Sequence, residues 1–275
     1  MRNFAQVDVF TEQPYRGNPL AVVLDAEGMT EQEMARFANW TNLSETTFLL
    51  PPTDPTADYR VRIFTPSTEY PFAGHPTLGS CHAWLESGGV PKAEQIIQEC
   101  GAGLIPIRRD GDRLAFAAPP VIRGGDPSDA ELEQVCAILQ LDRSEIVAAQ
   151  WADNGPGWIA VLLESADAVL AVQPDAGAAE SFDIGLAGRM ESDIADLEVR
   201  ALYKAGGHSG EDPVTGSLNA SLAQWLLRDG LMTAPYVARQ GTMLGRSGRV
   251  MIEEAGGEIW VGGSSVTCVR GQVVL

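Results

Sequence analysis

The stretch P-T-L-G-S-C-H-A-W-L at Pro76–Leu85 has a partial copy, P-V-T-G-S-L-N-A-S-L, at Pro213–Leu222. Five of the ten positions are identical at a constant separation of 137 residues: Pro76/Pro213, Gly79/Gly216, Ser80/Ser217, Ala83/Ala220 and Leu85/Leu222. Two shorter pairs of similar segments occur at similar separations. R-V-R-I-F at 60–64 corresponds to E-V-R-A-L at 198–202, and N-P-L-A-V at 18–22 to G-W-I-A-V at 157–161. A repeat distance near half of 275 residues indicates an internal duplication rather than a solenoid.

The duplication predicts two similar halves that each mix strands and helices. We place the boundary in the Pro- and Gly-rich stretch 118–127, which gives an N-terminal half at 1–118 and a C-terminal half at 119–265. The apolar run at 266–275 reads as a last strand that returns to the first half. Alternation and turn signals predict strands at 4–10, 20–24, 45–50 and 59–65, and helices at 30–39 and 77–88. Thr30 and Glu33 form the capping-box pattern of a helix start.

Composition excludes several classes of partner. The chain has 19 Lys and Arg against 37 Asp and Glu, a formal net charge of −18, which disfavours binding to nucleic acid and to anionic membrane surfaces. An anionic substrate must then be held by local groups. Only two lysines, Lys92 and Lys204, could form a Schiff base with a substrate or cofactor. No phosphate-binding motif lies beside Lys204.

The termini and cysteines favour a cytoplasmic protein. The first ten residues, M-R-N-F-A-Q-V-D-V-F, lack the basic and apolar regions of a signal peptide. No apolar run approaches the ~20 residues of a membrane span. The four cysteines form no C-x-x-C pair and the three histidines match no ligand spacing, so we expect neither a disulfide framework nor a metal site.

Each copy of the repeat is predicted to place a helix start after a strand and a Gly- and Pro-containing loop. The first N–H groups of a helix lack partners and bear partial positive charge, so such a start can bind an anion. Two ordinary helix caps would explain the same pattern. A polar side chain next to each start, His75 in one copy and Asp212 in the other, favours a binding site. A pseudo-twofold axis relating the two copies would bring both helix starts to one carboxylate.

Three polar residues are candidates for chemistry, each with an alternative structural role. Glu45 lies where a strand starts, and burial would give it the character of a general base; a solvated strand-edge carboxylate is the alternative. His75 could orient a substrate or move a proton, or make one backbone hydrogen bond in a loop. Asp212 precedes Pro213 and is a natural N-cap, a role compatible with catalysis.

Several motifs together resemble the phenazine-biosynthesis PhzF-like isomerase family. They are D-V-F-T at 8–11, G-N-P-L-A-V at 17–22, N-L-S-E-T at 42–46, A-G-H-P-T-L-G at 73–79, E-D-P-V-T-G-S at 211–217, and Q-G at 240–241 followed by R-S-G-R at 246–249. The resemblance implies the α+β fold of diaminopimelate epimerase, in which two pseudo-symmetric halves each roll a mixed β-sheet around a central helix. It places the active site between the halves.

The resemblance also implies residue roles. Glu45 matches the family's acid/base carboxylate, and His75 and Asp212 match polar groups of its cleft, so these three are the predicted catalytic residues. Predicted substrate-binding residues are Ser44, Gly74, Gly216 and Ser217.

The implied reaction is an isomerisation without a cofactor. In the family's named member, the carboxylate removes a proton from a dihydro-hydroxyanthranilate ring and returns one elsewhere. Epimerase and racemase relatives use two cysteines, whereas Ala73 and Pro213 hold the matching places here. We therefore expect an isomerase acting on a small carboxylated substrate, with no cofactor, as a homodimer. An amino-acid epimerase or racemase, or a catalytically silent carboxylate-binding protein, are the alternatives.

Overall fold

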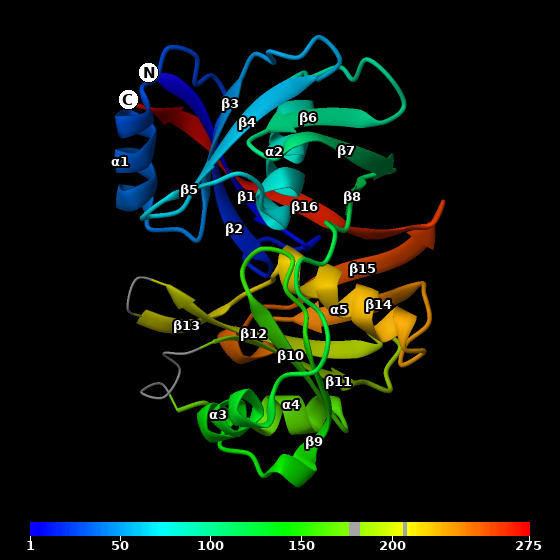
Figure 1. Cartoon of the computed structure of the whole chain (residues 1–275). Coiled ribbons are helices and arrows are strands. Elements are labelled where there is room, and N and C mark those ends of the chain that lie inside the picture. Colours follow the sequence, from blue (N-terminus) through cyan, green and yellow to red (C-terminus); the bar gives the residue numbers. More distant parts are fainter. Residues whose placement is uncertain (176–181, 206–207) are drawn as a thin grey trace. The chain divides into compact units, whose positions relative to one another are not determined.

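The computed structural model describes residues 1–175, 182–205 and 208–275 (Figure 1). The chain divides into two compact units, each described here by itself. Unit 1 comprises Met1–Ala117 and Gly262–Leu275, and unit 2 comprises Ala118–Val261. The sequence placed these borders after residue 118 and before residue 266.

Unit 1 is built from strands around one buried helix. Its elements are β1 (Arg2–Val9), β2 (Asn18–Val23), α1 (Glu31–Thr41), β3 (Thr46–Leu50), β4 (Tyr59–Phe64), β5 (Glu69–Tyr70), α2 (Gly74–Glu86), β6 (Ile96–Cys100), β7 (Gly103–Asp110) and β8 (Arg113–Ala117). The last strand, β16 (Glu258–Val273), begins in unit 2 and ends in unit 1.

The strands of unit 1 enclose α2. Their order is β1-β2-β3-β4-β6-β7-β8, and β16 neighbours both β8 and β1, which brings the sheet back to its first strand. Every residue from Gly74 to Cys81 in α2 is buried. A helix buried on all sides must be short of polar surface, and the small residues Gly79 and Ser80 let the strands approach closely.

Unit 2 has the same plan, with two outer helices where unit 1 has one. Its elements are α3 (Asp129–Leu139), η1 (Arg143–Glu145), β9 (Ile146–Trp151), β10 (Trp158–Leu163), α4 (Ala166–Ala171), β11 (Asp183–Arg189), β12 (Leu197–Ala205), β13 (His208–Asp212), α5 (Gly216–Arg228), β14 (Tyr236–Gln240), η2 (Thr242–Leu244) and β15 (Gly248–Ala255). The helix α5 takes the place of α2, with nine of its thirteen residues buried. Among the helices that the structure describes, none is long and apolar enough to span a membrane.

Strand pairing repeats between the units and confirms the fold class expected from the sequence. In unit 1, β1–β2 is antiparallel, β2–β3 parallel, β3–β4 antiparallel, β4–β6 parallel and β6–β7 antiparallel. In unit 2, β9–β10, β10–β11, β11–β12, β12–β14 and β14–β15 follow the same sequence of directions. Two copies of so specific an order indicate one duplicated unit.

The second central helix begins three residues later than an N-cap at Asp212 would place it. Pro76 is the third residue of α2, whereas Pro213 precedes α5, whose N-cap is Thr215 in an extended conformation. Both helices have 13 residues, and their first residues, Gly74 and Gly216, lie 142 rather than 137 positions apart. The reason is local: a hydrogen-bonded turn between Asp212 and Thr215 delays the second helix.

One local prediction is confirmed and another needs correction. Thr30 and Glu33 form the expected capping box at the start of α1. The last strand begins at Glu258, earlier than the predicted residue 266. The glycines at 262–263 stay extended within β16, so they do not interrupt the strand.

Candidate active site

Parallel pairing gathers the first group of candidate residues at one edge of unit 1. Strands β2 and β3 run in the same direction, so their starts lie at the same edge of the sheet. Asn18 begins β2, and Glu45 directly precedes β3. The side chain of His75, the second residue of α2, reaches both of them.

Glu45 and His75 form a close pair that is largely shielded from water. Glu45 Oε2 lies 3.4 Å from His75 Nε2, and the two side chains are 14% and 6% exposed. On the opposite side of the ring, the amide nitrogen of Asn18 lies 3.5 Å from His75 Nδ1. An amide nitrogen can only donate, so Nδ1 is the acceptor, and the neutral ring carries its proton on Nε2, facing Glu45.

Burial keeps the imidazole of His75 uncharged. Loss of solvation lowers the pKa of His75 to about 3. A neutral ring near pH 7 lies 3.4 Å from Glu45 without forming a permanent ion pair with it. The carboxylate therefore retains the ability to exchange a proton with a substrate.

Buried neutral histidine makes stability depend on pH. The unfolded chain binds a proton at His75 near pH 6.5, whereas the folded chain does so only near pH 3. Stability is therefore lost as pH falls below 6.5, by about 1.4 kcal/mol per pH unit from this group. We expect urea unfolding of His75→Gln between pH 7 and 4.5 to show a shallower pH dependence than wild type.

A matched variant separates this effect from general acid sensitivity. The pKa of His82 is also lowered by burial, but this residue is only partly buried and contacts Glu86 at 3.3 Å. We expect His82→Gln to reduce the pH dependence less than His75→Gln. Equal slopes for wild type and His75→Gln would contradict the assignment of a neutral buried His75.

The two central helices start differently from the others. The outer helices α1, α3 and α4 begin with side-chain caps from Thr30, Ser128 and Ser165. The N-caps of α2 and α5, Ala73 and Thr215, make no capping side-chain hydrogen bond to the helix. The first-turn N–H groups of both central helices are thus left without the side-chain acceptor that the outer helices have, a condition suited to an anion.

Asp212 is not the N-cap that the sequence suggested. It ends β13, and its Oδ2 accepts a hydrogen bond of 2.5 Å from the hydroxyl of Thr215, which is the N-cap. The residue before a proline is held in an extended conformation, so Asp212 continues its strand. The carboxylate nevertheless lies at the start of α5.

The remaining predicted residues lie at the same two helix starts or beside them. Gly74 and Gly216 are the buried first residues of α2 and α5. Ser217 accepts a hydrogen bond from Trp158 Nε1 through its hydroxyl and one from Asn154 through its carbonyl. Ser44 is exposed in the bend before Glu45. Unit 1 thus brings Glu45, His75 and Gly74 together, and unit 2 brings together Asp212, Gly216 and Ser217.

Comparison with known proteins identifies the family. The family model described as phenazine biosynthesis-like protein, PhzC-PhzF, matches residues 7–271. The chain belongs to this family. A relative from Schizosaccharomyces pombe, antisense-enhancing sequence 1, is 35% identical over 98% of each chain. Trans-2,3-dihydro-3-hydroxyanthranilate isomerase of Pseudomonas aeruginosa is 32% identical and is covered, like this chain, over its whole length.

A solved structure of a PhzF-family protein has the same fold. The phenazine biosynthesis protein of Bacillus anthracis matches with a TM-score of 0.86 at 23% identity, covering 100% of this chain and 99% of that chain. The family model and the two relatives confirm the family resemblance read from the sequence motifs.

In this PhzF-family chain, sequence reasoning missed residues that hold the predicted ones in place. Asn18, Thr215 and Gln240 are buried and hydrogen-bonded to His75 or to the turn at Asp212. All three lie inside the quoted family motifs. Their position inside these motifs was the only signal available from the sequence. Their burial beside the proposed catalytic groups is decided by tertiary packing.

Thiol chemistry finds no support at the two helix starts. The residues at the N-cap positions are Ala73 and Thr215, the latter replacing the Pro213 assigned from the sequence. Cys81 lies further along α2, where burial raises its pKa to about 12 and keeps it a neutral thiol. Within the described ranges, no group of three or more His, Cys, Asp or Glu side chains could hold a metal ion.

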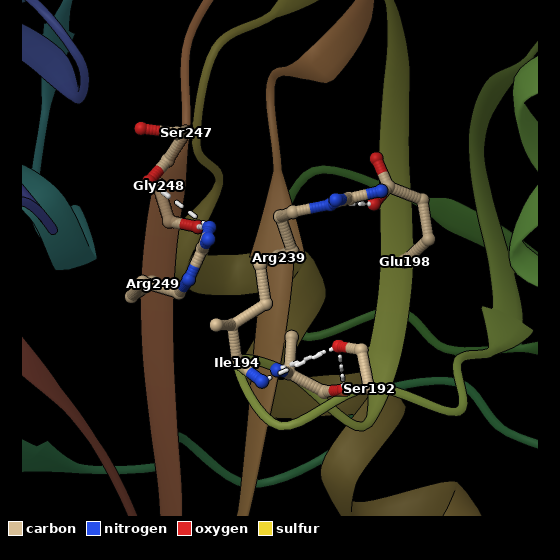
Figure 2. A network of polar contacts seen from close by, with 8 residues as sticks. Ser192, Ile194, Glu198, Arg239, Ser247, Gly248 and Arg249 are labelled. Atoms are coloured by element: carbon tan, nitrogen blue, oxygen red, sulfur yellow. Dashed lines mark hydrogen bonds and ion pairs between the residues drawn. The ribbon is translucent and has the colours of Figure 1, made fainter.

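Charged side chains lie on the face of the unit 2 sheet that is opposite to Gln240. Figure 2 shows the ion pair of Glu198 on β12 with Arg239 on β14, and Arg249 on β15 directed to the carbonyls of Ser247 and Gly248. Gln240, the neighbour of Arg239, points inward, because successive side chains of a strand alternate between faces. The sheet thus separates this ion pair and Arg249 from the turn at Asp212.

Proposed function

We propose that this chain is a cofactor-independent isomerase that moves a proton on a small carboxylated substrate, with Glu45 as the acid/base. The observation that carries the proposal is the shielded contact of 3.4 Å between Glu45 and a neutral His75 at the start of α2. A general base needs a carboxylate that is oriented and partly desolvated without being neutralised by a permanent cation. Family membership and the relative from Pseudomonas aeruginosa support the reaction class.

The proton transfer needs no other reagent. Glu45 takes a proton from a carbon of the substrate, which leaves a carbanion delocalised toward an unsaturated or carboxyl group. The protonated Glu45, or solvent in exchange with it, then delivers one proton to a different carbon. Substrate and product have the same composition, and the enzyme returns to its initial state.

His75 and Asn18 have defined parts in this scheme. We propose that Asn18 holds the ring with Nε2 toward Glu45, so that an uncharged group shields the carboxylate without neutralising it. We propose that Asp212 is the corresponding polar group of unit 2, and that Ser44 contributes a substrate contact beside Glu45.

We propose that the uncapped helix start of each unit can hold a substrate carboxylate. Gly74 lies at the start of α2, and Gly216 and Ser217 at the start of α5. Backbone N–H groups can hold a carboxylate in a chain whose net charge is −18, where few cationic side chains are available. We propose a dihydro-hydroxyanthranilate-like cyclic acid as the substrate class. We also propose a homodimer, from the family resemblance, and a cytoplasmic location, from the first residues and the cysteine pattern.

The test is turnover of trans-2,3-dihydro-3-hydroxyanthranilate in D₂O, followed by NMR. We expect an isomerised product with deuterium at the carbon that receives the new proton. Absence of both isomerisation and deuterium incorporation would overturn this substrate class. Deuterium incorporation at Cα of free amino acids, without isomerisation of the cyclic acid, would instead indicate an epimerase.

A further inference from the structure

The amide of Gln240 joins four groups around the turn that carries Asp212. Its Nε2 donates to the carbonyl of Asp212 at 3.0 Å and to the hydroxyl of Thr215 at 2.9 Å. Its Oε1 accepts from the N–H of Thr215 at 3.0 Å and from the amide of Asn219 at 2.8 Å. Gln240 is completely buried, and these four bonds use both hydrogens of its amide nitrogen and both lone pairs of its oxygen.

Two backbone groups decide the orientation of this amide. The N–H of Thr215 can only donate, so it must face Oε1, and the carbonyl of Asp212 can only accept, so it must face Nε2. In the opposite orientation, the N–H of Thr215 would face another donor, Nε2, and the carbonyl of Asp212 would face another acceptor, Oε1. Consequently Nε2, a donor, faces the hydroxyl oxygen of Thr215.

The direction of the next hydrogen bond follows. Because the hydroxyl oxygen of Thr215 already accepts from Gln240, its own hydrogen is free to point to Asp212 Oδ2, 2.5 Å away. A separation this short is typical of a hydroxyl that donates to a charged carboxylate. The chain of donors therefore runs from Gln240 through Thr215 to Asp212.

We propose that Thr215, oriented by Gln240, is a positioning residue that holds Asp212 in its ionised form with Oδ2 as an acceptor. A hydroxyl that donates to a carboxylate stabilises the charged form relative to the protonated one. The inference rests on the proposed function, in which Asp212 is a polar group of the active site. It assigns to Asp212 the part of a fixed negative charge and hydrogen-bond acceptor, whereas Glu45 is the group that gains and loses the proton.

Unit 1 offers an internal comparison. Gln98 on β6 is also completely buried, and its Nε2 donates to Thr77 of α2 at 2.9 Å. Gln98 and Thr77 lie 142 residues before Gln240 and Asn219, the same separation as between the two helix starts. The N-cap of α2 is Ala73, which has no hydroxyl. The duplicated unit thus keeps a buried glutamine beside each central helix, and in unit 2 the N-cap of that helix adds a hydroxyl aimed at a carboxylate.

Two ion pairs lie on the sheet face opposite to Asp212 and Gln240. Glu211 and Arg200 pair with each other at 2.9 Å, and Glu198 pairs with Arg239. Asp212 and Gln240 lie on the opposite sheet face from their strand neighbours Glu211 and Arg239. The contacts described at Asp212 Oδ2 and Thr215 Oγ1 come from uncharged groups.

The experiment compares Thr215→Val, which keeps the shape and removes the hydroxyl, with Thr215→Ser, which keeps the hydroxyl. The Asp212 carboxyl is followed by ¹³C NMR during a pH titration, with its signal assigned from Asp212→Asn. We expect the titration midpoint of Asp212 to rise by about one pH unit in Thr215→Val. In Thr215→Ser it should remain within a few tenths of a unit of wild type. An unchanged midpoint in Thr215→Val overturns the inference.

Turnover of trans-2,3-dihydro-3-hydroxyanthranilate gives a second readout. We expect kcat to fall on the order of tenfold in Thr215→Val, with its acid limit moved to higher pH and with KM little changed. Thr215→Ser should restore kcat. If Thr215→Val does not fold, Thr215→Cys keeps a weak donor of similar size and should give an intermediate midpoint.

The outcomes separate this inference from the proposed function. If Asp212→Asn retains wild-type turnover, the proposed part of Asp212 in the reaction fails, while the NMR titration still decides whether Thr215 holds its charge. If Asp212→Asn is inactive but Thr215→Val equals wild type in both readouts, the proposed function stands and the inference fails.

Discussion

Glu45→Gln is expected to fold normally and to bind substrate while losing turnover by about a thousandfold, within the 10²–10⁴-fold range of general acid–base catalysis. The amide has nearly the shape of the carboxylate, so the contact with His75 at 3.4 Å can be kept. An amide cannot accept a proton from carbon at any relevant rate. Turnover and deuterium exchange should therefore fall together, whereas KM should change little.

The matched control for this variant is Glu27→Gln. Glu27 is an exposed carboxylate in the loop after β2, and its neutralisation changes the net charge by the same amount. We expect wild-type kinetics from it. Near wild-type turnover by Glu45→Gln, measured with a preparation free of other isomerases, would remove Glu45 from the proposed role.

Arg200→Met is expected to destabilise the protein by about 3–5 kcal/mol, the range for breaking a buried ion pair. The side chains of Arg200 and Glu211 are 4% and 11% exposed, and they form two parallel hydrogen bonds of 3.1 and 2.9 Å. The same guanidinium donates to the carbonyls of Val169 and Val172 at the end of α4. Methionine would leave a buried carboxylate without its cation and two carbonyls without a donor.

Urea unfolding at pH 7 measures this loss, and a double variant tests its cause. Removing Glu211 as well, in Arg200→Met/Glu211→Leu, should recover much of the stability, because no buried charge then remains. The two carbonyls at the end of α4 would still lack their donor, so recovery should be incomplete. A single variant as stable as wild type would show that the pair makes no net contribution. Since Glu211 adjoins Asp212 on β13, the single variant should also lose activity.

Much of the fold could be predicted from local pattern. The alternation of polar and apolar residues in β1 and the capping box of α1 are encoded within a few neighbouring residues, and the structure has both. The duplication was visible because the two units keep similar residues at corresponding strands, such as Val61 in β4 and Val199 in β12. The register at the central helices was misjudged because Pro213 lies in a turn, although proline is equally acceptable in the first turn of a helix.

The candidate site was predictable in its reactive groups and not in its supporting ones. Glu45, His75 and Asp212 stand in distinctive motifs, and the structure places the first two in contact. Asn18 and Gln240 were not selected, since an amide in a strand has no chemical signature of its own. Their importance comes from contacts 57 and 28 residues away along the chain, to His75 and to Asp212.

The sequence by itself determined the family, the duplicated α+β plan and the scarcity of lysine and of paired thiols, because these depend on residue identity and order. Tertiary structure decided which groups are neutral, oriented or held in place. Burial makes His75 an uncharged neighbour of Glu45, and the packing of β14 against α5 directs the hydroxyl of Thr215 to Asp212. The physical reason is that protonation and hydrogen-bond direction depend on solvent exclusion and on neighbours from distant strands, neither of which is local in sequence.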